Sequence, residues 1–410
     1  MPTIPRWPIH GRAERAALLG VLRQPDWSRA GGQAVDTFER EFAAYVGARS
    51  VLGVTNGTQA MELALALHDV GPGDEVIVPA FTFLSPALAV RRMGAVPVPV
   101  DVDPVTYCMS AEAAEAAVTG RTRAIIPVHM AGHAADVAGI AALAERRRIA
   151  LIHDAAHAPG TAWEGRPLPA YGGTVCYSFQ NLKLLTAGEG GALAFSDSAL
   201  RDRAFEMHNV ARGPVAASYD HSGAAWSNLR MSEFHAALLS AQLNRLPAQN
   251  RRRELRARQL DDLIAAIPDV VPQGRDPRCT VHAHYMYMFA LHGRHAETGV
   301  RDHLLQVLRG HGVPASIGFP VVYRTGAFWA GRRAGNKAAG RAETETAGRP
   351  AETETAGRRA GDDAVRALAG KCPVAEDLAS NTIWLHHRVL LAGRRDMKEI
   401  ADIVRGAVHG

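Results

Sequence analysis

The chain has 410 residues, 47% of them hydrophobic and 21% charged, and its 46 basic residues are nearly offset by 41 acidic ones, for a net charge of +5. This composition predicts a globular protein of about two or three domains, and the even spread of basic residues disfavours nucleic-acid or membrane-surface binding. No apolar run reaches the ~18 residues of a membrane span and the N-terminus lacks a secretory signal, so we expect a cytoplasmic protein.

Short apolar, β-branched runs alternate with helical stretches between about residues 50 and 200. The runs are "VLGVT", "DEVIVPA", "AVPVPVDVD", "RAIIPVHM", "RIALIHD", "TVCYSF" and "GALAF". Runs of this kind are typical of strands covered on both faces. They predict an α/β domain with a mixed, mainly parallel sheet flanked by helices.

A long helical pattern follows in "MSEFHAALLSAQLNRL", which Pro247 interrupts before the arginine-rich "RRRELRARQLDDLIAAI". We expect these arginines to form a solvated helix face. Beyond them, "HYMYMFALHG", "RDHLLQVLRGHG" and "MKEIADIVRGAV" predict a smaller α+β domain. We therefore expect a large domain at 1–245, including an N-terminal segment, and a small C-terminal domain at 246–410.

The small domain contains a sequence repeat with a period of nine, because residues 342–346 recur as 351–355. The repeat has no large apolar side chain that could offset the entropy of ordering it. We expect a disordered surface loop at 332–363 without a chemical role.

The four cysteines are far apart and form no CxxC pair, so neither a disulfide framework nor a metal site is expected. They are predicted to be small core residues or free thiols: Cys108, Cys176, Cys279 and Cys372.

Lys183 is the only lysine among the first 336 residues; the others are Lys337, Lys371 and Lys398. Arginine supplies positive charge elsewhere in this region, so we expect Lys183 to do what a guanidinium cannot, namely lose its proton and form a Schiff base. It follows the expected strand "TVCYSF" and precedes the turn "AGEGG", whose glycines allow close approach of a ligand. The alternative is an ordinary surface lysine in a loop.

Asp154 and His157 lie at the end of an apolar run in "LIHDAAHAPG". Ligands of open α/β sheets bind beyond the carboxyl ends of strands, so Asp154 is expected to face a ligand, such as the pyridinium nitrogen of pyridoxal phosphate. Asp154 could instead cap a helix, but its position 29 residues before Lys183 favours a shared site. His157 could contact the cofactor or be a core histidine.

The stretch "VTNGTQAMELALAL" places Gly57 and Thr58 between a strand and a helix. Free N–H groups at a helix start can hold a phosphate, with the Thr58 hydroxyl as a further donor, although Asn-Gly-Thr is also an ordinary turn. In "PAFTF", Phe83 offers a ring that could stack on a planar cofactor or simply pack in the core.

Four features follow one another along the chain: a candidate phosphate site, an aromatic ring, an acid and a lysine. Their order resembles that in pyridoxal-phosphate aminotransferases of the DegT/StrS type. The chain resembles that family over nearly its whole length, most specifically in "SFQNLKLLTAGEGG" and "HDAAHA". The resemblance implies the aspartate-aminotransferase fold (fold type I), a homodimer with shared active sites, and glutamine or glutamate as amino donor.

The resemblance also assigns roles to individual residues. It implies that Lys183 binds the cofactor covalently, that Asp154 pairs with the ring nitrogen, that Phe83 and His157 flank the ring, that Gly57, Thr58 and Ser178 hold the phosphate, and that Asn228 reaches the phosphate of the neighbouring subunit.

Within the family, "YRTGAFW" and "WLHHRVLLAG" resemble the amino-hydroxybenzoate branch. That branch implies a keto-cyclitol or aminoshikimate-like acceptor in antibiotic or other secondary metabolism, and we expect a carbocyclic ketone in preference to a nucleotide-linked keto-sugar. The polar residues expected near the substrate are His129, Tyr323, Arg324, His386 and His387.

Two features depart from the family pattern: the repeat, and Leu182, which stands where glycine is expected beside the lysine. Because of them, the identity of the amino acceptor is not determined by the resemblance. One alternative is a synthase that couples aminotransfer to dehydration and releases 3-amino-5-hydroxybenzoate. Others are a sugar dehydratase, in which histidine replaces the lysine, and a non-catalytic cofactor-binding subunit; Lys183 and Asp154 disfavour both.

Overall fold

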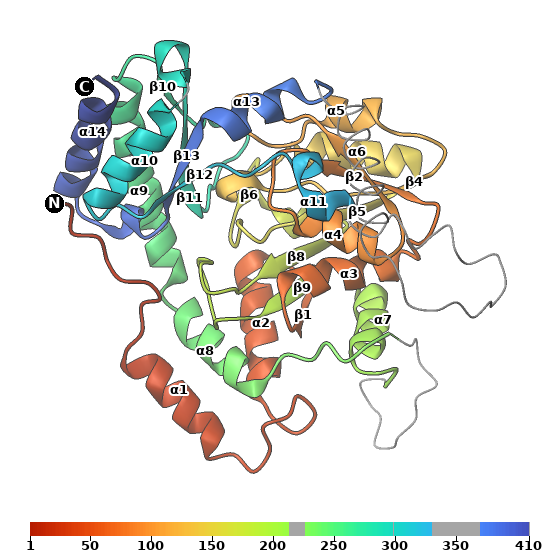
Figure 1. Cartoon of the computed structure of the whole chain (residues 1–410). Coiled ribbons are helices and arrows are strands. Elements are labelled where there is room, and N and C mark those ends of the chain that lie inside the picture. The colour runs from red at the N-terminus through yellow and green to blue at the C-terminus, as the bar shows by residue number, and fades with distance from the viewer. Residues whose placement is uncertain (213–225, 298, 330–369, 410) are drawn as a thin grey trace, which may run out of the picture.

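The computed structural model describes residues 1–212, 226–297, 299–329 and 370–409 (Figure 1). The sequence repeat and the loop expected at 332–363 lie outside these residues.

The helices of the described part are α1 (Arg12–Leu22), α2 (Ala34–Val46), α3 (Gly57–Leu67), α4 (Ser85–Arg92), α5 (Ala111–Ala116), α6 (Val137–Arg147), α7 (Ser198–His208), α8 (Glu233–Leu243), α9 (Leu246–Ala265), α10 (Val300–Gly310), α11 (Gly326–Trp329), α13 (Pro373–Asn381) and α14 (Arg394–His409). The strands are β1 (Ser50–Val54), β2 (Glu75–Pro79), β3 (Val96–Val100), β4 (Thr122–Ile125), β5 (Ala150–Asp154), β6 (Ala162–Trp163), β7 (Arg166–Pro167), β8 (Thr174–Ser178), β9 (Gly191–Phe195), β10 (Val270–Pro272), β11 (Met286–Leu291), β12 (Ala315–Ile317) and β13 (Thr382–His386).

The larger sheet has seven strands in the order β1-β9-β8-β5-β4-β2-β3. Strands β3, β2, β4, β5 and β8 are mutually parallel, and β9 runs antiparallel to both β8 and β1. Each of the seven runs predicted from the sequence forms one of these strands. The predicted α/β fold with a mixed, mainly parallel sheet is confirmed.

Both faces of this sheet are buried, as the apolar runs require. Neighbouring strand residues alternate between two hydrophobic clusters; in β2, for example, Val76 and Val78 belong to one and Ile77 to the other. Helices α3, α4 and α7 contribute to the first cluster, and α2, α6 and α8 to the second. The sheet is therefore the middle layer of three, typical of α/β domains (Figure 1).

Helices α8 and α9 meet at Pro247, which lies in the first turn of α9, where a proline costs no hydrogen bond. The expectation of a solvated arginine face on α9 is wrong at one position, because Arg253 is fully buried. Its guanidinium donates to Asn250 Oδ1 at 2.7 Å and lies 5.8 Å from the Trp7 ring centroid. Buried polar partners and an aromatic ring thus take the place of water around this cation.

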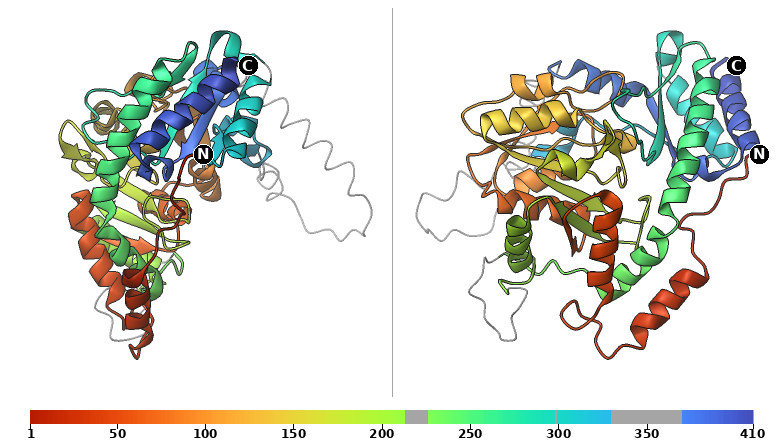
Figure 2. Two further views of the ribbon diagram at one scale, coloured as in Figure 1. Left: turned by 90° about the vertical axis from the view of Figure 1, so that its left-hand side faces the viewer. Right: turned by 180° about the vertical axis from the view of Figure 1, so that it is seen from behind.

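The second sheet is antiparallel, with the order β10-β11-β13-β12. Helices α9, α10 and α14 pack on it around a third hydrophobic cluster. The first residues of the chain run in an extended path beside α8 and α9 and reach α14, where the Thr3 N–H donates to Asp396 at 2.8 Å (Figure 2). The N-terminal segment thus links the two sheets. We still propose the division near residue 245, between α8 and α9.

All four cysteines are buried and unpaired, which confirms their predicted place in the core. Among the helices of the described residues, none has the length and apolar character needed to cross a membrane.

Candidate active site

A cavity of about 630 Å³ lies where the carboxyl edge of the seven-stranded sheet faces the four-stranded sheet. Strands β1, β2, β5 and β8 all point towards this edge, so the residues that follow them converge there. Gly57, Phe83, Asp154 and Ser178 line the cavity for this reason, although they are dispersed in the sequence.

Asp154 is the last residue of β5 and is buried. Its Oδ1 accepts the N–H of Ala156 at 3.0 Å. Burial raises the pKa of the carboxyl group above its ordinary value, and the hydrogen bond from Ala156 and the charge of Lys183 offset this only in part. A carboxylate in such surroundings is stabilised strongly by a cationic partner in direct contact.

Lys183 enters the same cavity from the loop between β8 and β9. Its Nζ lies 4.4 Å from the ring centroid of Tyr285, and His157 stacks on the same ring at 4.1 Å and 15°. Burial, and then the charge of Lys183, lowers the pKa of His157 well below its ordinary value, so the imidazole is neutral. The structure thus brings together the acid, the lysine and the histidine that the sequence singled out.

The start of α3 lies at one corner of the cavity. The Asn56 side chain caps the helix by accepting an N–H of the first turn at 2.9 Å, and the Thr58 hydroxyl lies 3.0 Å from that of Ser85. A Cβ added at Gly57 would lie 2.8 Å from Cβ of Ser178, so only glycine permits this approach of helix to strand. Uncapped N–H groups at such a helix start attract phosphate or carboxylate.

Two buried polar atoms of the cavity wall lack a hydrogen-bond partner within the described residues: Thr82 Oγ1 and His157 Nδ1. Buried polar atoms are rarely left unsatisfied. Together with the buried Asp154 carboxyl, they are polar groups of the cavity wall that a bound ligand would satisfy.

Phe83 projects into the cavity with most of its ring exposed, and it makes an edge contact with Phe319 at 6.4 Å. Asn228 is exposed and does not line the cavity; its Oδ1 accepts the N–H of Arg230 at 3.4 Å. The predicted reach of Asn228 to a neighbouring subunit stays a prediction.

Tyr323 and Arg324, expected as substrate contacts, do not line the cavity. Tyr323 is fully buried and donates to Glu376 Oε1 at 2.7 Å, while Arg324 pairs with Glu376 Oε2 at 2.8 Å. Both polar groups are therefore engaged by a residue far along the sequence. Their predicted contact with a substrate stays a prediction.

The three expected histidine contacts are also placed elsewhere. His386 is buried and accepts a backbone N–H at 3.2 Å. His387 lies 3.1 Å from the carbonyl oxygen of Leu182, and His129 lies 3.2 Å from His153, with the two rings stacked. His387 therefore supports the loop that carries the lysine, whereas His129 is buried beside His153 and accepts the N–H of Ala135 at 3.1 Å.

Several cavity residues were missed by sequence reasoning. Gln180 and Glu189 flank Lys183 in the chain, and this proximity could have identified them. Tyr285, Phe319 and Trp384 come from the C-terminal part and carried no local signal, because only folding brings them to the lysine.

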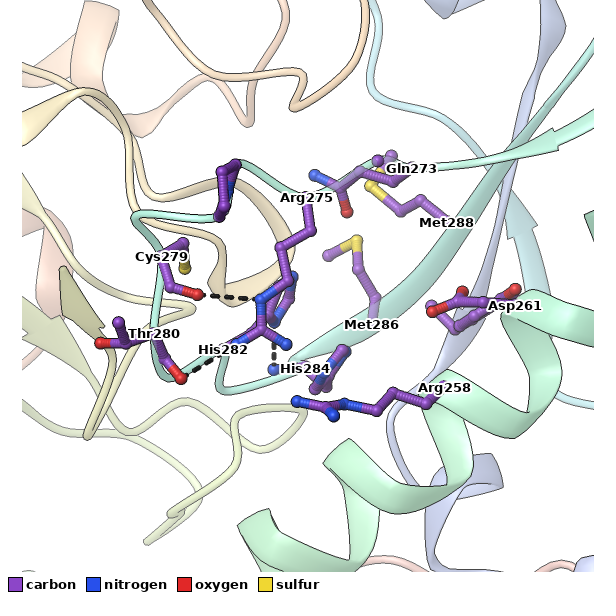
Figure 3. A pocket seen from close by; sticks show the side chains of 13 residues that line it. Arg258, Asp261, Gln273, Arg275, Cys279, Thr280, His282, His284, Met286 and Met288 are labelled. Carbon is purple, nitrogen blue, oxygen red and sulfur yellow. Dashed lines mark hydrogen bonds between the residues drawn. The ribbon is translucent and has the colours of Figure 1, made fainter. Parts of the chain in front are cut away.

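A second cavity of about 360 Å³ lies between α9 and the segment 273–288 (Figure 3). Its most prominent cation, Arg275, donates to the carbonyl oxygens of Cys279 and Thr280 at 2.8 and 3.1 Å and pairs with Glu254 at 2.5 Å. The arginine is thus satisfied within the protein, and we assign this cavity no chemistry.

A sequence model of the DegT/DnrJ/EryC1/StrS aminotransferase family matches residues 8–347. The chain is 44% identical over 409 residues to a 3-amino-5-hydroxybenzoate synthase of Amycolatopsis mediterranei (strain S699), covering 99% of this chain and 98% of the relative. It is 38% identical to an L-glutamine:scyllo-inosose aminotransferase of Streptomyces griseus, over 77% of this chain and 76% of that one. A crystal structure of a 3-amino-5-hydroxybenzoic acid synthase superposes with a TM-score of 0.88 at 44% identity, covering 100% and 99% of the two chains.

Proposed function

The chain belongs to the DegT/DnrJ/EryC1/StrS aminotransferase family, and from that premise we propose that its main cavity binds pyridoxal phosphate and aminates a neutral carbocyclic ketone. Family membership confirms the resemblance inferred from the sequence, together with fold type I. The observation that carries the proposal is the convergence of Lys183, Asp154 and the start of α3 in one cavity.

The residues present fit this cofactor. The helix start at Gly57 and Thr58, with Ser178 beside it, suits the phosphate, and the buried Asp154 suits a protonated ring nitrogen. His157 and Phe83 are the candidate flanking rings. Pyridoxal phosphate, when bound, supplies a ring that accepts the electron pair left by proton removal at the carbon bearing the amino group.

We assign two tasks to Lys183. Its amine anchors the cofactor between turnovers, and after the amino donor displaces it, Nζ takes and returns the proton at the reacting carbon. The Asp154 carboxylate meanwhile holds the proton on the ring nitrogen through charge attraction in a buried setting. Glutamine or glutamate is the proposed donor, and the proposed assembly is a homodimer in which Asn228 serves the neighbouring site.

Gly57→Ala tests the phosphate corner. The new Cβ would meet Ser178 at 2.8 Å and push α3 from β8, so we expect affinity for pyridoxal phosphate to fall by about tenfold or more. Titration with pyridoxal, which lacks the phosphate, should show a much smaller loss. Gly71→Ala is the matched control, since nothing lies within 4 Å of the added atom. Equal losses for both ligands would place the phosphate elsewhere.

The cavity walls guide the choice of acceptor. Phe83, Phe319 and Trp384 give it broad apolar surfaces, and Lys183 is the sole lysine or arginine among the described lining residues. A nucleotide diphosphate would meet one cation among these residues, Lys183, whose amine the proposed reaction itself uses. Gln180 and Glu189 can hydrogen-bond hydroxyl groups, which favours a neutral keto-cyclitol.

Steady-state kinetics with glutamine and three acceptors tests this choice: scyllo-inosose, a carboxylate-bearing carbocyclic ketone and a nucleotide-linked keto-sugar. We expect kcat/KM to be highest for scyllo-inosose, by about tenfold or more over the nucleotide-linked keto-sugar, because Gln180 and Glu189 can hydrogen-bond its hydroxyl groups whereas the diphosphate must bury two charges. A higher kcat/KM for the nucleotide sugar would refute the carbocycle preference and leave the aminotransferase assignment intact.

A second candidate is aminotransfer coupled to dehydration, giving 3-amino-5-hydroxybenzoate. The 44% identity to a synthase of that name favours it, whereas the hydroxyl-binding groups Gln180 and Glu189 favour a neutral cyclitol. The same kinetic panel separates the two.

A further inference from the structure

Leu182 is a large apolar side chain in an unusual setting. It immediately precedes Lys183, lines the main cavity and is 41% exposed. An apolar side chain left open beside a reactive amine becomes buried when a ligand fills the cavity, and it then limits the ligand's size.

The backbone around Leu182 is held by both of its polar groups. Its N–H donates to Gln180 Oε1 at 2.8 Å, and its carbonyl oxygen accepts from His387 Nε2 at 3.1 Å. On either side, the Lys183 N–H donates to the Gln180 carbonyl at 2.8 Å, and the Asn181 carbonyl accepts from the Trp7 indole at 3.0 Å.

The histidine anchor is itself fixed in one protonation state. Arg253 Nη2 lies 3.4 Å from His387 Nδ1, and because a guanidinium can only donate, Nδ1 accepts and Nε2 carries the proton given to Leu182. Burial lowers the pKa of His387 well below its ordinary value, so the ring stays neutral. Trp7 packs edge-on against it at 4.4 Å.

The N-terminal segment and the residue after β13 thus hold one short loop directly, and α9 holds the histidine that does so. With its backbone held in this way, Cα and Cβ of Leu182 keep a fixed place beside the cavity. Phe83, Phe319 and Trp384 contribute apolar surface to the same cavity. A single ring suits such a space, and the leucine takes up room that a second bulky group would need.

We propose that Leu182 is a specificity-determining residue that restricts the acceptor to a single ring. The proposal rests on the proposed aminotransferase function and names the side chain that sets its substrate range. Replacing leucine by alanine or glycine removes three or all four side-chain carbons beside Lys183 and opens the cavity at that point.

The test uses the full-length holoenzyme and the variants Leu182→Ala, Leu182→Gly and Leu182→Met. We expect the ratio of kcat/KM for a nucleotide-linked keto-sugar to that for scyllo-inosose to rise by about tenfold or more in the first two. Methionine has a similar volume and should keep the wild-type ratio. Leu255→Ala is the control for the same substitution outside the cavity and should keep the wild-type ratio. That leucine is 59% exposed on α9 and does not line the cavity.

A second measurement separates this proposal from the proposed function. The half-reaction with glutamine, followed by the absorbance of the bound cofactor, should stay within about threefold of wild type in every variant, because glutamine is unbranched and narrow and its fit does not depend on the size of residue 182. A wild type that completes neither half-reaction would refute the proposed function. An unchanged ratio in Leu182→Ala and Leu182→Gly would overturn the specificity role. Loss of the glutamine step in Leu182→Ala would also overturn it, because the side chain would then position the cofactor.

Discussion

Lys183→Ala is expected to abolish turnover and to remove the covalent link to the cofactor. Loss of a positioned proton-transfer group alone costs about 10²–10⁴-fold in rate, and loss of the anchoring amine adds to this. Borohydride reduction followed by denaturation should leave cofactor on the wild-type chain and none on the variant. The variant should still bind pyridoxal phosphate through the α3 corner, which a direct titration measures.

Two further variants sharpen this test. Lys183→Arg keeps the positive charge but supplies a group that does not lose its proton, so it should be as inactive as the alanine variant. Lys398→Ala should behave as wild type, because its exposed side chain only pairs with Asp402 at 2.9 Å. A reducible adduct in Lys183→Ala would assign the covalent role to another amine.

The sequence predicted the sheet because both faces of each strand are buried, so apolar runs marked every strand without knowledge of the partners. The same logic placed Asp154 near Lys183, since β5 and β8 are neighbours and the loop after β8 returns across their shared edge. For these two residues the position predicted from the local sequence is the position found in the fold. The other predicted cofactor residues also line the cavity, apart from Asn228.

The cavity residues contributed by the C-terminal part of the chain could not be predicted in this way. Tyr285, Phe319 and Trp384 reach the cavity only because the second sheet folds against the first. Tyr323 is an attractive polar residue in the sequence, yet Glu376 satisfies its hydroxyl. Arg253 belongs to an arginine run that looks solvated, and only the docking of Trp7 and His387 over α9 buries it. Contacts between distant segments decide all of these cases.

Asp154→Asn is expected to lower turnover by about 10²–10³-fold, the scale on which removal of one oriented electrostatic partner acts in a buried site. Asparagine keeps the shape and can still accept the N–H of Ala156, but it removes the negative charge opposite the ring nitrogen. The visible spectrum of the bound cofactor should change at neutral pH, as its ring nitrogen loses the proton that the carboxylate holds in place.

The cofactor-free protein gives a second, independent measurement of this residue. The folded-state pKa of Asp154 is raised above its unfolded value, so the ionised carboxylate destabilises the folded chain at pH values above the folded pKa. At neutral pH, the Tm of Asp154→Asn should therefore equal or exceed that of the wild type. Any increase in Tm over the wild type should vanish as the pH falls below the pKa of Asp154 in the unfolded chain. Asp197→Asn is the matched control, because Asp197 only caps α7, through the N–H of Ala199 at 2.9 Å, and asparagine caps equally well. If Asp154 were also only a cap, both variants would keep full activity; loss in Asp154→Asn alone, with folding intact, assigns its charge to the reaction.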